Sequence, residues 1–236
     1  MLEKIYTIPV NEAFDACRDD PSLGCPVCLM YRKLQAEALD TILGGAMMEP
    51  DIRIKTNEQG FCAHHMSMLL TKKNRLGLAL ILESHLDQIN ERCADKPLAA
   101  MTGTKGVPAA KEIARLDGEC YICGKIEDHF SKMLSNILWL WESEKEFREK
   151  FDAAPYICLP HYRRLIDSKT VLPKKLAPDF CDALRKVTFD YFDELRGDVK
   201  HFIKKFDYRF DDEPWGNSKD SVERAAKFLR GDRSDV

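Results

Sequence analysis

Four short cysteine motifs, repeated in one order at nearly one spacing, constrain this chain more than any other feature. Cys25-Pro-Val-Cys28 is followed by Cys62-Ala-His64-His65, and the step from Cys28 to Cys62 is 34 residues. Cys120-Tyr-Ile-Cys123 is followed by Cys158-Leu-Pro-His161 after a step of 35 residues. Flanking apolar positions repeat at an offset of 95, as Leu39, Ile42 and Leu43 and then Leu134, Ile137 and Leu138. Because repetition at a fixed spacing is typical of duplicated structural units, we predict two copies of one module.

The segment between the copies has the composition of a linker. Residues 95–108 are rich in small residues and carry a proline near each end. We therefore predict a helical metal-binding module 1 at residues 1–95, a linker at 96–115, a module 2 at 116–206 and a tail at 207–236. In the tail, Asp220 and Glu223 have capping-box spacing and Gly231 follows the last apolar position, so a short helix is expected.

The apolar pattern predicts helices throughout. Apolar residues recur every three or four positions over residues 28–44, 76–93 and 123–144. The longest such stripe runs from Phe180 to Phe206 and predicts a helix of about 30 residues. No alternating run is long enough for a strand. The predicted fold is all-α, with two repeated helical modules each closed by a Cys3His metal site, then a long amphipathic helix and a short helical tail.

Each module offers three thiols and one imidazole, which together complete a tetrahedral zinc shell. Soft sulfur ligands argue against magnesium and calcium, and histidine is uncommon as an iron–sulfur ligand. We therefore expect two zinc ions per chain, each held within one module. The predicted ligands are Cys25, Cys28, Cys62 and His65 in module 1, and Cys120, Cys123, Cys158 and His161 in module 2.

The spacing leaves two alternatives open. The modules could exchange halves, so that Cys25 and Cys28 share an ion with Cys158 and His161. Alternatively, the cysteines could be buried free thiols that pack as small apolar residues.

Other residues near these motifs are expected to have no ligand role. His65 aligns with His161, so we expect His64 to lie outside the ligand set. We expect Trp215 to dock on the protein's own helices rather than on a partner. The remaining cysteines, Cys17, Cys93 and Cys181, are predicted to be core residues. The histidines His85, His129 and His201 are predicted to be surface residues or hydrogen-bonded core residues.

The motifs together resemble a known family. The similarity lies in Cys25-Pro-Val-Cys28, Gly60-Phe-Cys62-Ala-His64-His65, Cys120-Tyr-Ile-Cys123, Cys158-Leu-Pro-His161 and the tail from Lys204 to Gly216. In these motifs the chain is similar to an uncharacterised bacterial family, chiefly from Firmicutes, classed as a domain of unknown function. The resemblance covers nearly the whole chain. It implies a bacterial setting and supports the repeat, but it implies no activity.

Known catalytic motifs are absent from the sequence. It has no His-Glu-x-x-His, Gly-x-Ser-x-Gly or Walker A loop, and four ligands per zinc leave no open position for substrate. We therefore expect a non-catalytic protein with a protein partner, of interaction or scaffold type. A thiol and zinc redox sensor is the alternative, and a zinc enzyme or a nucleic-acid-binding protein is less favoured.

Charge and hydropathy predict location and partners. With 36 Lys and Arg against 39 Asp and Glu, the chain lacks the dense basic face of a duplex binder. A chain of 236 residues needs no disulfides to hold its core, so its nine cysteines fit a reducing compartment. No apolar run approaches the roughly 20 residues of a membrane span. We expect a cytoplasmic protein.

Overall fold

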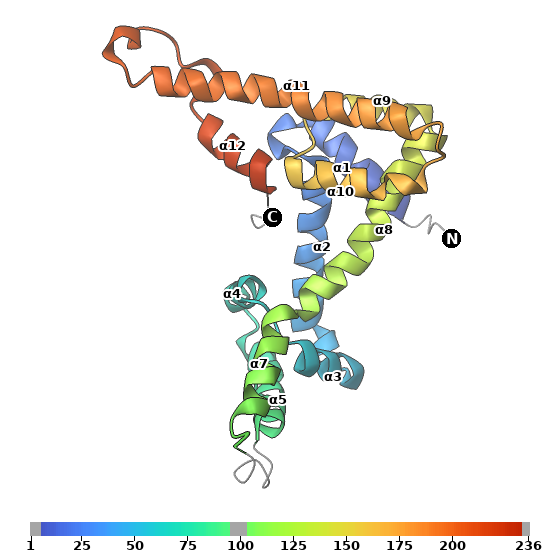
Figure 1. The fold of residues 1–236 in the computed structure, drawn as a ribbon, viewed down its shortest axis with the longest axis vertical. Helices are drawn as coiled ribbons and strands as arrows, with labels where there is room; N and C mark the ends of the chain where they lie inside the picture. Colours follow the sequence, from blue (N-terminus) through green and yellow to red (C-terminus); the bar gives the residue numbers. More distant parts are fainter. Residues whose placement is uncertain (1–5, 95–102, 233–236) are drawn as a thin grey trace. The chain divides into compact units, whose positions relative to one another are not determined.

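The computed structural model describes residues 6–94 and 103–232, and every regular element within these ranges is helical (Figure 1). The all-α prediction is confirmed. The α-helices are α1 (Thr7–Asp19), α2 (Pro26–Leu43), α3 (Pro50–Gln59), α4 (Ala63–Thr71), α5 (Arg75–Cys93), α7 (Val107–Gly118), α8 (Tyr121–Ser143), α9 (Lys145–Asp152), α10 (Leu159–Ser168), α11 (Ala177–Lys204) and α12 (Ser221–Arg230). Short 3₁₀ turns occupy Pro21–Leu23, Gly45–Met48, Lys169–Val171, Tyr208–Phe210 and Gly216–Ser218.

The longest predicted helix forms close to its expected bounds, because its apolar face is buried. The stripe that begins at Phe180 becomes α11, a helix of 28 residues in which Phe180, Leu184 and Leu195 are buried. The helix ends earlier than predicted, since Phe206 lies beyond it and is 75% exposed.

The chain divides into two compact units that do not follow the order of the sequence. Unit 1 contains the described residues of Met1–Lys33 and Phe130–Val236, and unit 2 contains those of Leu34–His129. Both boundaries fall inside helices, one in α2 and one in α8. The predicted modules have a different boundary, because they divide the chain at a linker between residues 95 and 116. Residues 107–115 of the expected linker belong to α7, which packs against α5.

Unit 1 is held together by an aromatic core. The ring of Phe14 in α1 lies 5.0 Å from Phe147 and 5.7 Å from Phe151, both in α9. Phe151 in turn contacts Phe180 of α11, with ring centroids 5.7 Å apart. All four side chains have no exposed area, so α1, α9 and α11 share one core.

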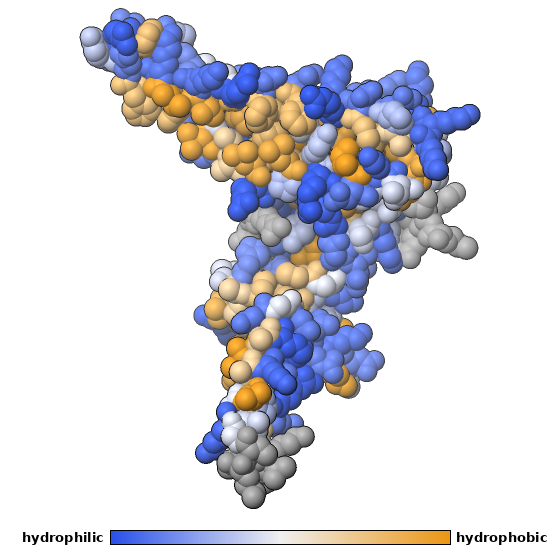
Figure 2. Space-filling model, in the orientation of Figure 1, coloured by the Kyte–Doolittle hydropathy of each residue, from blue (hydrophilic) through white to orange (hydrophobic). Residues whose placement is uncertain are grey.

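The tail of the chain packs on unit 1. Phe228 of α12 is fully buried against Tyr156, Tyr191 and Phe192, and Figure 2 shows apolar side chains along the side of α11 that faces α12. The predicted end of α12 is confirmed, because Gly231 follows the helix with φ +79°. The predicted cap is not formed, since the Asp220 carboxylate accepts from the Arg224 side chain instead of a backbone N–H.

Unit 2 is smaller and consists of α3, α4, α5 and α7 with the adjoining parts of α2 and α8. Helix α5 is its centre, because α3, α4 and α7 all pack against it. Among the described residues, no helix is long and apolar enough to cross a membrane.

Candidate metal centres

All four cysteine motifs lie at the N-termini of helices. The first cysteine of each motif precedes the helix, and its carbonyl oxygen accepts the first helical hydrogen bond at 2.8–3.1 Å, as for Cys25 with Leu29, Cys62 with Met66, Cys120 with Gly124 and Cys158 with Tyr162. The second ligand of each motif, three positions on, therefore lies in the first turn. Helix N-termini carry partial positive charge, which favours the thiolate form of cysteine.

Centre A, defined as Cys25, Cys28, Cys158 and His161, joins the N-termini of α2 and α10. Its three sulfur atoms lie 3.8, 3.4 and 3.1 Å from Nδ1 of His161, in the order of the cysteines. The Sγ atoms of Cys28 and Cys158 are 3.5 Å apart. Four potential ligand atoms thus surround one point within unit 1.

Centre B, defined as Cys62, His65, Cys120 and Cys123, joins the N-termini of α4 and α8 in the same way. Nδ1 of His65 lies 3.4 Å from Cys62 Sγ, 3.4 Å from Cys120 Sγ and 3.3 Å from Cys123 Sγ. The Sγ atoms of Cys62 and Cys123 are 3.9 Å apart. Each of the two centres could hold a metal ion.

The pairing within modules that we expected is wrong. Each Cys-x-x-Cys pair meets the Cys-x-x-His pair of the other module, which is the exchange that spacing left open. The cause is the path of the chain after α2. Instead of returning to Cys25, the chain forms α3, which packs against α5, and so Cys62 becomes part of unit 2.

The two centres differ in burial. In centre A, Cys25 and Cys28 are 1% exposed and Cys158 is 0% exposed. In centre B, Cys120 is 9% exposed, Cys62 is half-buried and Cys123 is exposed. The cysteines of centre A are thus closed to solvent, and centre B has an open side at Cys123.

The pKa values of the thiols depend on how deeply each sulfur atom is buried and on how close the other sulfur atoms lie. Burial raises the pKa of Cys25 well above its usual value. Although the residue as a whole is exposed, partial desolvation of its thiol and the neighbouring Cys120 raise the pKa of Cys123 to about 12. Burial alone would raise the pKa of Cys62. Hydrogen bonds from the backbone of His65 and from the thiols of Cys120 and Cys123 outweigh this effect, so the pKa of Cys62 is lowered.

A glycine with a positive φ angle lies just before one cysteine motif of each centre. Gly24, directly before Cys25, has φ +77°, and a Cβ atom there would lie 2.6 Å from the Tyr156 hydroxyl. Gly60, two residues before Cys62, has φ +60°, and a Cβ atom would lie 3.0 Å from Nε2 of His85. These conformations favour glycine. The carbonyl of Gly60 also accepts from the Tyr121 N–H at 3.0 Å, which ties the two motifs of centre B together.

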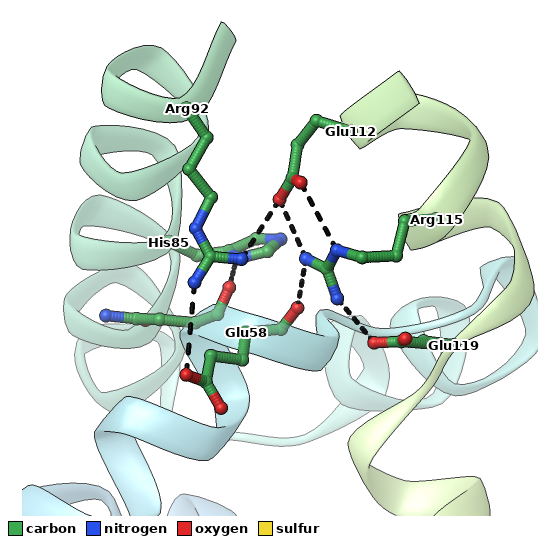
Figure 3. Close-up of polar contacts among 7 residues, drawn as sticks. Glu58, His85, Arg92, Glu112, Arg115 and Glu119 are labelled. Atoms are coloured by element: carbon green, nitrogen blue, oxygen red, sulfur yellow. Dashed lines mark hydrogen bonds and ion pairs between the residues drawn. The ribbon is translucent and has the colours of Figure 1, made fainter. Parts of the chain in front are cut away.

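An ionic network next to centre B aligns the segments that lead into it (Figure 3). Arg115 of α7 bonds Glu112 at 2.7 Å, Glu119 at 2.5 Å and the Glu58 carbonyl at 2.5 Å. Arg92 of α5 bonds Glu112 at 3.2 Å. Glu119 directly precedes Cys120 and Glu58 lies at the end of α3, so the network fixes the segments before both motifs of centre B.

The segment after α12 completes centre A, a role that no sequence pattern indicates. The N–H of Asp232 donates to Cys28 Sγ at 3.3 Å. Its carboxylate pairs with Arg32 and with Lys227, both at 3.2 Å. Gly231 lies against the sulfur atoms, since a Cβ there would be 3.8 Å from Cys28 Sγ. Residues 231–232 therefore cover the buried sulfurs.

The residues expected to lie outside the centres do so. His64 is exposed, as expected for a residue without a ligand role. Cys17 is fully buried, as predicted, but the core prediction is wrong for Cys93 and Cys181, which are only half-buried. Nδ1 of His85 donates to the Asn57 carbonyl at 2.9 Å. Trp215 packs on Phe202 of α11 with ring centroids 5.8 Å apart, so the docking prediction is confirmed.

The helices and the two Cys3His clusters together define the class: a helical protein with two candidate metal centres. The chain belongs to a family of unknown function, DUF6062, whose model matches residues 1–235. No curated protein and no solved structure matches it.

Proposed function

We propose that the protein binds two zinc ions, one in centre A and one in centre B, and that both ions are structural. The observation that carries this proposal is the presence of two closed sets of three thiols and one imidazole, each assembled from two helix N-termini.

The spacing of the ligand atoms supports zinc. Zn–S bonds of about 2.3 Å and Zn–N bonds of about 2.0–2.1 Å give a tetrahedral shell with S···N edges of about 3.6 Å and S···S edges of about 3.8 Å. The S···N distances are 3.1–3.8 Å in centre A and 3.3–3.4 Å in centre B. Among the sulfur atoms, those of Cys28 and Cys158 lie 3.5 Å apart and those of Cys62 and Cys123 lie 3.9 Å apart, and all four ligand atoms of each centre lie within 4.8 Å of one another. Both centres thus have the size of a zinc shell.

Four protein ligands leave no coordination position for water or substrate, which favours a structural role over a catalytic one. Each ion would fasten together two helices that come from distant parts of the sequence, α2 with α10 and α4 with α8. The ion would also stabilise the thiolates, which burial otherwise disfavours.

Metal analysis of the purified, reduced protein tests this proposal. We expect about two zinc per chain that resist dialysis against a weak chelator. Removal of zinc by a strong chelator should reduce helicity and lower the melting temperature, because structural zinc contributes on the order of 10 kcal/mol to folding. A folded chain without bound metal would refute the proposal.

We further propose that the protein acts through a protein partner, as an interaction or scaffold protein of the cytoplasm. An exposed apolar cluster, defined as three residues close in sequence at and beyond the end of α11, supports this: Ile203 is 65% exposed, Phe206 75% and Tyr208 85%. Exposed apolar side chains that lie together are typical of interaction surfaces. Two of the basic residues nearby are paired within the protein, Lys204 with Glu213 and Arg209 with Asp207. This arrangement favours a protein partner over nucleic acid.

Substitution of this cluster by serine tests the interaction role. A partner should cross-link to the wild-type chain and not to a variant with Ile203→Ser, Phe206→Ser and Tyr208→Ser, while both chains keep two zinc. The matched control is Leu86→Ser, an apolar residue of unit 2 that is 63% exposed. Equal cross-linking of the wild type and the triple variant would exclude this surface.

The second candidate function is a thiol and zinc redox sensor. The exposure of Cys123 favours it, because zinc-bound thiolates that reach solvent can be oxidised with loss of the metal.

A further inference from the structure

We propose that oxidation occurs first in centre B, where peroxide converts Cys62 and Cys123 to a disulfide and releases one zinc, while residues 231–232 slow the oxidation of centre A. This inference rests on the proposed zinc binding and names which of the two centres is the reactive one. The two centres have the same ligand types, so any difference in reactivity must come from their surroundings.

The two centres differ in how accessible their cysteines are to solvent. Cys123 is exposed, and its Sγ lies 3.9 Å from the Sγ of Cys62, itself half-buried. The three cysteines of centre A are at most 1% exposed. A peroxide molecule can therefore reach a sulfur atom in centre B without any opening of the fold, whereas centre A must open first.

The cover on centre A is built from the tail of the chain. Phe228 is fully buried and anchors α12 on unit 1, and Gly231 then turns the backbone toward the sulfurs with φ +79°. The N–H of Asp232 donates to Cys28 Sγ, and its carboxylate pairs with Arg32. The cover thus lies directly on a sulfur atom of centre A, and an oxidant reaches that atom only after the tail moves.

The proposed oxidation of centre B proceeds in two steps. The Cys123 thiolate attacks peroxide, forming an S–O bond as the O–O bond breaks and hydroxide leaves, so that sulfur is oxidised by two electrons to a sulfenic acid. The Cys62 thiolate then attacks this sulfur, forming the S–S bond as the S–O bond breaks and a second hydroxide leaves. A zinc ion held in centre B would lose the Cys62 and Cys123 thiolates as ligands and would leave as Zn²⁺ without a change of oxidation state.

The experiment treats the full, zinc-loaded chain with hydrogen peroxide and follows zinc release with a colorimetric chelator. Peptide mapping by mass spectrometry identifies the disulfide. We expect one zinc per chain to be released at least about ten times faster than the second, together with a Cys62–Cys123 disulfide. A dithiol reductant and added zinc should restore two zinc per chain.

Four variants make the test more specific. Cys123→Ser removes a ligand of centre B, so this variant should carry one zinc and show no fast release. Cys93→Ser and Cys181→Ser, which alter half-buried cysteines outside both centres, should leave the fast release unchanged. A further variant, Gly231→Val, should displace the cover, because a β-branched residue does not tolerate φ +79°. In that variant the cysteines of centre A should be oxidised at least about ten times faster than in the wild type.

The outcomes separate this inference from the proposed function. A chain that carries no zinc before oxidation refutes the proposed function itself. A chain that carries two zinc but releases both at one rate, or forms its disulfide in centre A, overturns only the inference. A Cys120–Cys123 disulfide would overturn the assignment of Cys62, and unchanged reactivity of centre A in Gly231→Val would overturn the role of the cover.

Discussion

The crosswise pairing of motifs makes a quantitative prediction about double variants. Cys25→Ser and Cys158→Ser each remove one ligand of centre A, and Cys62→Ser removes one ligand of centre B. Each single variant should retain one zinc per chain of the two. The Cys25→Ser and Cys158→Ser double variant should still retain one, because both changes affect the same centre.

The matched double variant, Cys25→Ser with Cys62→Ser, should retain no zinc, because it damages both centres. Pairing within modules gives the reverse result, since Cys25 and Cys62 would then share an ion. Native mass spectrometry after a challenge with a weak chelator counts the ions directly. Cys181→Ser, at a half-buried cysteine outside the centres, is the control and should keep two.

Stability should show the same pattern. Loss of a structural zinc costs on the order of 10 kcal/mol, so the first change in a centre has a large effect and the second has little left to remove. The coupling energy between Cys25 and Cys158 should then be nearly as large as the effect of either change alone, and the effects of Cys25 and Cys62 should nearly add. Zero zinc in the Cys25 and Cys158 double variant, with one zinc in the Cys25 and Cys62 double variant, would refute the crosswise pairing.

Three further predictions test the packing within each unit. Gly60→Ala should destabilise unit 2 by about 1–3 kcal/mol and weaken zinc binding in centre B, because Gly60 has φ +60° and its Cβ would lie close to His85. Thermal melts measure the loss of stability, and Gly118→Ala, which has open space around it, is the control and should be tolerated. Phe228→Ala should cost about 3–5 kcal/mol in urea unfolding, and Leu229→Ala, 49% exposed, much less. Cys17, whose pKa burial raises to about 11, should resist alkylation at about pH 8 until the chain unfolds.

The helices could be predicted from sequence because helix formation here follows local patterns. The expected ranges 28–44, 76–93 and 123–144 match α2, α5 and α8 within two residues at each end. Apolar residues at every third or fourth position fix which face is buried, whatever the partner is. The end of α11 could not be predicted, because Phe206 continues the stripe in sequence although its side chain is exposed.

The ligand residues could be identified for a similar reason, because residue type and a spacing of three place two ligands in one helical turn. Which pairs meet is decided by contacts between distant segments. Helix α3 packs against α5, and the network of Arg115 holds the segment before Cys120 on the end of α3. No local pattern records these contacts, and the two possible pairings use the same spacing.

Loop entropy shows that helix packing, and not ease of closure, selects the crosswise arrangement. Pairing within modules closes loops of 34 and 35 residues, whereas centre A joins cysteines 130 residues apart and centre B joins ligands 55 residues apart. With a cost of (3/2)RT ln n, the longer loops disfavour the crosswise pairing by about 1.2 and about 0.4 kcal/mol. Centre B is nested inside the loop of centre A, so closure of centre B first shortens the loop that remains and reduces this cost. A penalty of about 1–2 kcal/mol is small beside the burial of even one core phenylalanine such as Phe180, and the packing of the helices therefore decides which motifs meet.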